Sequence, residues 1–83
     1  MQLEYMVYVT YNENAIMNSS ECACIYCYKK FEPKEIIDFW YDIKELTNGT
    51  AICPNCSVDS IVPNSLIKYD DQLLKKWHKI GWN

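Results

Sequence analysis

The sequence predicts one small α+β domain, residues 1–83, built around a bound metal ion, with a short β-sheet and two helices. The chain has 83 residues, a length at which a hydrophobic core alone supplies little stability and a metal or disulfides are usually needed. Hydrophobic residues make up 49% and charged residues 23%, which is typical of a packed domain. We expect an N-terminal extension over residues 1–23, a metal-binding core over 24–62 and a helical segment over 63–83.

The N-terminal extension predicts a strand over residues 2–11. Apolar residues alternate there with mostly polar ones, which is the period of a half-buried strand; the alternating set is Leu3, Tyr5, Val7, Val9 and Tyr11. Residues 12–21 are mainly polar and predict a loop. The free edge of such a strand can pair with a second copy of the chain, so we expect a homodimer.

Between the two cysteine pairs the sequence predicts a helix over residues 33–46. Pro33 suits a first helical position, and Glu35 favours the positive end of the helix dipole. Asn48-Gly49 predicts a tight turn, and residues 50–52 a short strand leading to the second pair. After that pair residues 58–62 predict another extended run, which Pro63 ends.

The C-terminal segment predicts an amphipathic helix over residues 71–80. Asp70 is suited to cap its N-terminus, and Gly81 is a candidate for the residue that ends it. The apolar side chains recur at helical spacing; they are Leu73, Leu74, Trp77 and Ile80.

Two C-x-x-C pairs carry the strongest signal for function. Each pair can curl into a knuckle whose two sulfurs face the same point, and zinc prefers four such thiolates in a tetrahedral, closed site. The predicted ligands of one structural Zn²⁺ ion are Cys24, Cys27, Cys53 and Cys56. Four thiolates leave no open coordination position, so we expect no enzyme. A redox pair, disulfides and unliganded cysteines remain as alternatives.

Cys22 and His78 are the other candidate ligands. Cys22 could replace Cys24 as the partner of Cys27, but two intervening residues are the usual spacing, which favours Cys24. His78 is a single histidine on the predicted C-terminal helix, so we expect it outside the metal site.

Charge and cysteine content indicate which classes of partner and which cellular compartment to expect. The net charge is −3 and all eight basic residues are lysines, which disfavours nucleic acid, and duplex DNA above all. An odd number of cysteines and no secretion-like opening segment predict a reducing, cytoplasmic setting. No apolar run approaches the roughly 20 residues that span a bilayer.

The core resembles a family of small stand-alone zinc-ribbon-like proteins of bacteria and phages, whose functions are mostly unknown. The resemblance lies in the first C-x-x-C pair, the segments 31–36 and 48–56 with Trp40 between them, and the run 58–62. It implies a zinc-ribbon-like fold and a bound metal. The chain departs from it at Ser57, where many zinc knuckles have glycine, and in residues 43–47, which lengthen the segment before Asn48. If position 57 needs a positive φ, serine is strained there.

We expect the domain to act as a protein-interaction or regulatory module, for example as a viral or phage accessory protein. Aromatic residues are enriched at interface anchors. The candidates are Trp40 and Tyr41 on the first predicted helix, Trp77 on the second and Trp82 just after it. The alternative is a nucleic-acid-binding or transcription-associated zinc ribbon, in which aromatic side chains stack on unpaired bases. A redox or metal-donor protein is a third class, and it requires a reactive thiol in the metal-bound form.

Overall fold

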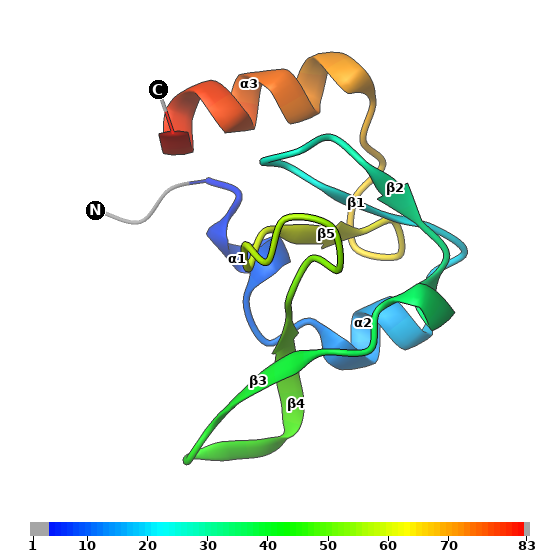
Figure 1. Cartoon of the computed structure of the whole chain (residues 1–83), viewed down its shortest axis with the longest axis vertical. Helices are drawn as coiled ribbons and strands as arrows, with labels where there is room; N and C mark the ends of the chain where they lie inside the picture. Colours follow the sequence, from blue (N-terminus) through cyan, green and yellow to red (C-terminus); the bar gives the residue numbers. More distant parts are fainter. Residues whose placement is uncertain (1–3, 83) are drawn as a thin grey trace.

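The computed structural model describes residues 4–82 and has helices and short antiparallel strands (Figure 1). The helices are α1 (Met6–Val9), α2 (Glu13–Met17), the 3-10 turn η1 (Pro33–Glu35) and α3 (Asp71–Trp82). The strands are β1 (Cys22–Cys24), β2 (Lys30–Phe31), β3 (Phe39–Asp42), β4 (Glu45–Ala51) and β5 (Ile61–Pro63). The α+β class is confirmed, whereas the zinc-ribbon-like class stays a prediction.

A three-stranded sheet in the order β2-β1-β5 forms the centre of the molecule. Its middle strand β1 is fully buried and consists of small residues, so both of its faces can be closely covered. Ala23 lies opposite Lys30 on one side and Val62 on the other. The sheet therefore fixes Cys24, the last residue of β1, directly beside Ile61 of β5.

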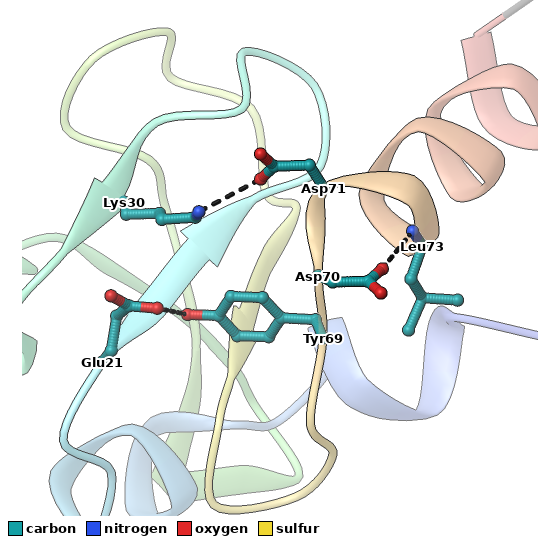
Figure 2. Close-up of polar contacts among 6 residues, drawn as sticks. All are labelled: Glu21, Lys30, Tyr69, Asp70, Asp71 and Leu73. Carbon is teal, nitrogen blue, oxygen red and sulfur yellow. Dashed lines mark hydrogen bonds and ion pairs between the residues drawn. The ribbon is translucent and has the colours of Figure 1, made fainter.

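α3 packs on this sheet and confirms the predicted C-terminal helix. Leu74 and Trp77 join one core cluster with Ala23 and Val62. The Leu73 N–H donates to Asp70 Oδ1 at 2.8 Å, which confirms the predicted cap (Figure 2). The two flanking contacts in Figure 2 tie the start of the helix to the sheet region; they are Lys30 Nζ to Asp71 Oδ1 at 3.1 Å and the Tyr69 hydroxyl to Glu21 at 2.6 Å.

Gly81 lies inside α3 rather than ending it, because the helix continues to Trp82. A Cβ at Gly81 would collide with the hydroxyl of the buried Tyr5. Glycine therefore lets the last turn of α3 approach the segment before α1.

The predicted helix over residues 33–46 is wrong beyond its first turn. η1 begins at Pro33 as expected, with Glu32 and Glu35 forming a reciprocal capping box. Ile36 is already extended, with φ −86° and ψ 107°. The aromatic run that follows suits a strand better than a helix, and it forms β3, whose partner is β4.

The β3–β4 hairpin reverses direction at residues 42–45, so the turn predicted at Asn48-Gly49 is also wrong. Both of these residues lie within β4. Phe39 packs on the core at the base of the hairpin. The hairpin projects at the end of the molecule opposite α3 (Figure 1).

The predicted strand over residues 2–11 is wrong for residues 4–11, and residues 2 and 3 lie outside the described part. The segment folds as a turn followed by α1, and α2 replaces much of the expected loop. Tyr5 and Val9 are buried, whereas Val7 between them is 58% exposed. The burial thus follows the helical spacing i, i+4 and not the alternation of a strand. The edge on which the homodimer prediction depended is absent from residues 4–11.

Among residues 4–82, no helix combines the length and the apolar composition that crossing a bilayer requires.

Candidate metal centre

The two C-x-x-C pairs fold into knuckles with the same backbone bonding. Within the first knuckle the N–H groups of Cys27 and Tyr28 donate to the Sγ and the carbonyl of Cys24, at 3.5 and 2.9 Å. In the second knuckle Cys56 and Ser57 donate in the same way to Cys53, at 3.4 and 2.9 Å. The two knuckles therefore present their sulfurs in equivalent positions.

Each knuckle ends in a left-handed residue. Tyr28 has φ 66° and Ser57 has φ 67°. This conformation lets the chain turn back, so that the N–H of Cys24 reaches Lys29 O at 2.9 Å and the N–H of Cys53 reaches Val58 O at 3.0 Å. The positive φ considered for position 57 is confirmed, and position 28 carries the same strain.

The four sulfurs of the knuckles form one compact cluster. All four predicted ligand atoms lie within 4.8 Å of one another. Sγ of Cys24 is 3.6 Å from that of Cys56, and Sγ of Cys27 is 3.7 Å from that of Cys53. A tetrahedral ion with metal–sulfur bonds of about 2.3 Å requires sulfurs about 3.8 Å apart. The cluster can therefore hold a metal ion, and the separations are much longer than the ~2.05 Å of a disulfide.

Hydrogen bonds surround the sulfurs. The hydroxyl of the buried Ser60 lies 3.2 Å from Cys24 Sγ and can donate to a thiolate there. Asn55 N–H donates to Cys53 Sγ at 3.4 Å. Donors of this kind stabilise the ionised form that binds a metal. Ser60 is therefore part of the immediate surroundings of the site.

Burial dominates the thiol pKa values, although not uniformly. Desolvation raises the pKa of Cys24 far above its usual range despite the hydrogen bonds from Ser60 and Cys27, and it also raises that of Cys56. Burial opposes ionisation of Cys27 as well, but hydrogen bonds, the largest from the Asn55 side chain, lower its pKa to about 7. A metal entering this site must therefore displace protons from Cys24 and Cys56.

Cys22 and His78 lie outside the cluster. Cys22 is fully buried, its Sγ is 3.6 Å from Phe31 O, and burial raises its pKa to about 12. Cys24 lies two positions further along β1, and its sulfur joins the cluster in place of that of Cys22. His78 Nδ1 instead lies 3.1 Å from Ile25 O, and since a carbonyl only accepts, the histidine carries a proton on Nδ1 and donates it.

The structure separates the four aromatic residues predicted to form a partner surface. Trp40 and Tyr41 are exposed on β3, at 57% and 43%. Trp77 is 1% exposed and belongs to the core, so its predicted place on a partner surface is wrong. Trp82 is half-buried and stacks on Tyr5. Trp77 lies on the apolar stripe of α3, which is the signal that it packs inward.

The apolar residues that flank Trp40 carry no signal in the sequence for an exposed position. Ile37 and Ile43 are 84% and 85% exposed and Leu46 is 68% exposed. All three fall within the predicted helix over residues 33–46, and only the hairpin geometry shows that they are exposed.

No family model matches the chain, and comparisons with curated proteins and with solved structures likewise gave no match. The resemblance to small bacterial and phage proteins therefore stays a prediction, and functional inference depends on this chain's own residues.

Proposed function

We propose that the chain is a zinc-stabilised protein-interaction module, with a structural ion at the four-cysteine cluster. Zinc is supported by the donor set, since four soft thiolates at tetrahedral separations suit this ion. Four protein ligands leave no position for a substrate or water, which supports a structural role and not a catalytic one. The ion would join β1 to the loop that follows β4, far apart in the chain.

The observation that carries the interaction role is the apolar hairpin, defined as residues 37–46. Among residues 4–82, five of the twelve exposed large apolar or aromatic side chains lie in it, whereas such residues are normally scattered on a monomer surface. They are Ile37, Trp40, Tyr41, Ile43 and Leu46. Apolar and aromatic residues gathered on a projecting element are typical of an interface.

The two edges of the hairpin differ. The outer edge of β4 is covered, because the N–H of Gly49 donates to Glu13 at 3.0 Å and the N–H of Ala51 donates to Asn12 at 3.0 Å. Within residues 4–82, β3 pairs only with β4. The other edge of β3 therefore offers backbone groups to an added strand of a partner, with Trp40 and Ile37 beside it.

The anchoring of the hairpin supports its use as a rigid docking element. Tyr41 donates its hydroxyl to Glu13 at 2.9 Å, and Tyr11 donates its hydroxyl to Asp42 at 2.9 Å. A two-stranded hairpin alone is marginal in water, so these side chains hold it in one orientation. Less ordering entropy is then lost when a partner binds.

Affinity capture with the zinc-loaded protein tests this role. Wild-type protein and the Trp40→Ala and Ile43→Ser variants are immobilised and exposed to a lysate of the source cells. We expect proteins retained by the wild type to be lost with both variants, since the apolar contacts are removed. Leu66→Ser is the matched control, because Leu66 is 49% exposed but lies outside the hairpin.

Only variants that melt like the wild type enter the comparison. Retention that is equal for wild type and hairpin variants, or that falls as much with Leu66→Ser, would contradict the docking role. Self-association in sedimentation that Ile43→Ser abolishes would identify the partner as a second copy of the chain. A viral or phage accessory role stays a prediction.

A further inference from the structure

A second surface lies at the other end of the molecule from the hairpin, where the first knuckle meets α3. Aromatic rings and lysines lie together on it, and none of these side chains takes part in the proposed metal site or hairpin surface. We call it the aromatic–lysine face; its residues are Tyr26, Tyr28, His78, Trp82, Lys30, Lys75 and Lys79.

The rings of this face form a continuous group. His78 lies between Tyr26 and Tyr28, with ring centroids 5.5 and 5.2 Å away. Trp82 is 5.7 Å from His78 and 5.5 Å from Tyr26. The hydrogen bond from His78 to Ile25 O fixes the central ring. Tyr26 and Tyr28 are each 41% exposed, so their faces or edges remain open to a ligand.

The α3 residues of this face share one stripe of the helix. Lys75, His78, Lys79 and Trp82 follow the spacing i, i+3, i+4 and i+7, so they lie on one side of the helix. Lys75 and Tyr28 also line a hollow of about 300 Å³ together with Lys30 and Asp71. The hollow thus places cationic groups directly beside an exposed ring.

Charge is distributed unevenly between this face and the rest of the molecule. The face holds three lysines and two adjacent carboxylates, Asp71 and Glu21, a net of +1. The remaining five lysines and nine carboxylates sum to −4, which together give the net −3 of the chain. The net negative charge of the chain, which disfavours nucleic acid, therefore lies away from this face.

We propose that the aromatic–lysine face binds single-stranded nucleic acid. Unpaired bases stack on the open tyrosine rings, and the lysine ammonium groups contact the phosphates. A duplex does not fit this chemistry, because its bases are already stacked, and the chain has no arginine to read guanine edges. This proposal goes beyond the hairpin docking role and does not depend on it.

Fluorescence anisotropy with labelled oligonucleotides and the zinc-loaded protein tests the proposal. The probes are oligo-dT and oligo-U of about 12 nucleotides, within the span of small single-strand binding sites. We expect half-saturation on the order of 10 μM at low salt for at least one probe. Contacts of the three lysines to phosphates predict a slope of log affinity against log salt of about −2. The two probes show whether DNA or RNA is preferred.

Paired variants locate the binding surface. Tyr28→Ala should weaken binding about 10-fold, whereas Tyr28→Phe, which keeps the ring, should not. Lys75→Ala should weaken binding and reduce the salt slope by about 1. Lys44→Ala is the matched control, since it removes the same charge at the hairpin. Asp71→Asn should strengthen binding, because it removes the carboxylate that pairs with Lys30 at 3.1 Å.

Three results would overturn the proposal. The first is no binding of either probe at low salt. The second is equal loss of affinity with Lys44→Ala and Lys75→Ala, which would mean unlocalised charge attraction. The third is equally tight binding of a polyglutamate peptide of the same charge, which would assign the face to an acidic protein partner. Binding is compared only for variants that keep the wild-type metal content and melting temperature.

Discussion

At the scale of single residues, the side chain of Asn12 links three distant segments of the fold. Its Nδ2 donates to Tyr8 O at 3.1 Å and to Ile61 O at 2.7 Å, and its Oδ1 accepts from the N–H of Ala51 at 3.0 Å. The residue is 1% exposed. One amide thus connects the N-terminal segment to both sheets.

We predict that Asn12→Ala lowers the free energy of unfolding by about 3 kcal/mol, because it leaves two buried backbone groups and one partly buried one without their side-chain partner. Urea denaturation of the metal-loaded protein measures the effect. Asn14→Ala is the matched control, since Asn14 is exposed and its side chain should matter by less than about 0.5 kcal/mol. Equal midpoints for the two variants would contradict the connecting role of Asn12.

The role of Asn12 could not be predicted from the sequence, whereas the clustering of the four cysteines could. Cysteine spacing is local, so two C-x-x-C pairs indicate their own knuckles, and the choice of Cys24 over Cys22 is in line with the sulfur cluster. The partners of Asn12 lie 39 and 49 residues away at Ala51 and Ile61. Nothing in the neighbouring sequence indicates them, and a polar residue after a short apolar segment is normally assigned to a loop.

At the scale of elements, the β3–β4 hairpin shows where local patterns fail. Pro33 and Glu35 do start a helical turn, as predicted. The prediction that the helix continues to residue 46 depended on apolar residues that occur equally well in a strand. Short apolar runs do not distinguish a helix from a strand. Contacts from α2, which is distant in sequence, favour the strand. Glu13 accepts hydrogen bonds from both the Tyr41 hydroxyl and the Gly49 N–H. At the N-terminus the opposite happened: the alternating residues predicted a strand, and residues 6–9 form the helix α1.

We predict that Gly49→Ala destabilises the hairpin. A Cβ at position 49 would lie 2.8 Å from Tyr41 Cε1 and 3.0 Å from the backbone oxygen of Trp40. The ring can move, but the backbone oxygen cannot without distorting β3, so we expect a loss of about 1–3 kcal/mol. Thermal melting measures it, with the nearby exposed Thr47→Ala as control. An unchanged melting temperature for Gly49→Ala would be inconsistent with the close packing of Tyr41 on β4.

At the scale of the whole molecule, the four-cysteine cluster brings together segments that are far apart in the chain. β1 supplies Cys24, and the loop after β4 supplies Cys53 and Cys56. Two core clusters lie on either side of the central sheet; the first includes Ile16 and the cysteines, and the second includes Trp77 and α3. For so small a core, a bound ion would add much of the folding free energy.

We predict that metal affinity rises steeply with pH. Burial raises the pKa of Cys24 and of Cys56, so both thiols are protonated at neutral pH without a metal, and binding must release those protons. With these two protons released, and a third from Cys27 below its pKa of about 7, affinity should increase at least about 100-fold per pH unit between pH 6 and 8. Competition with a chromophoric chelator measures it. An affinity independent of pH would mean that the cysteines are not the ligands.

Metal content of purified variants, determined by native mass spectrometry, tests the central claim most directly. Cys22 and Cys24 are both fully buried cysteines on β1, so Cys22→Ser and Cys24→Ser are matched substitutions. We predict one zinc ion per chain in the wild type and in Cys22→Ser, and loss of that ion with unfolding in Cys24→Ser. Retention of the ion by Cys24→Ser, its loss from Cys22→Ser, or a wild type without metal would contradict the account.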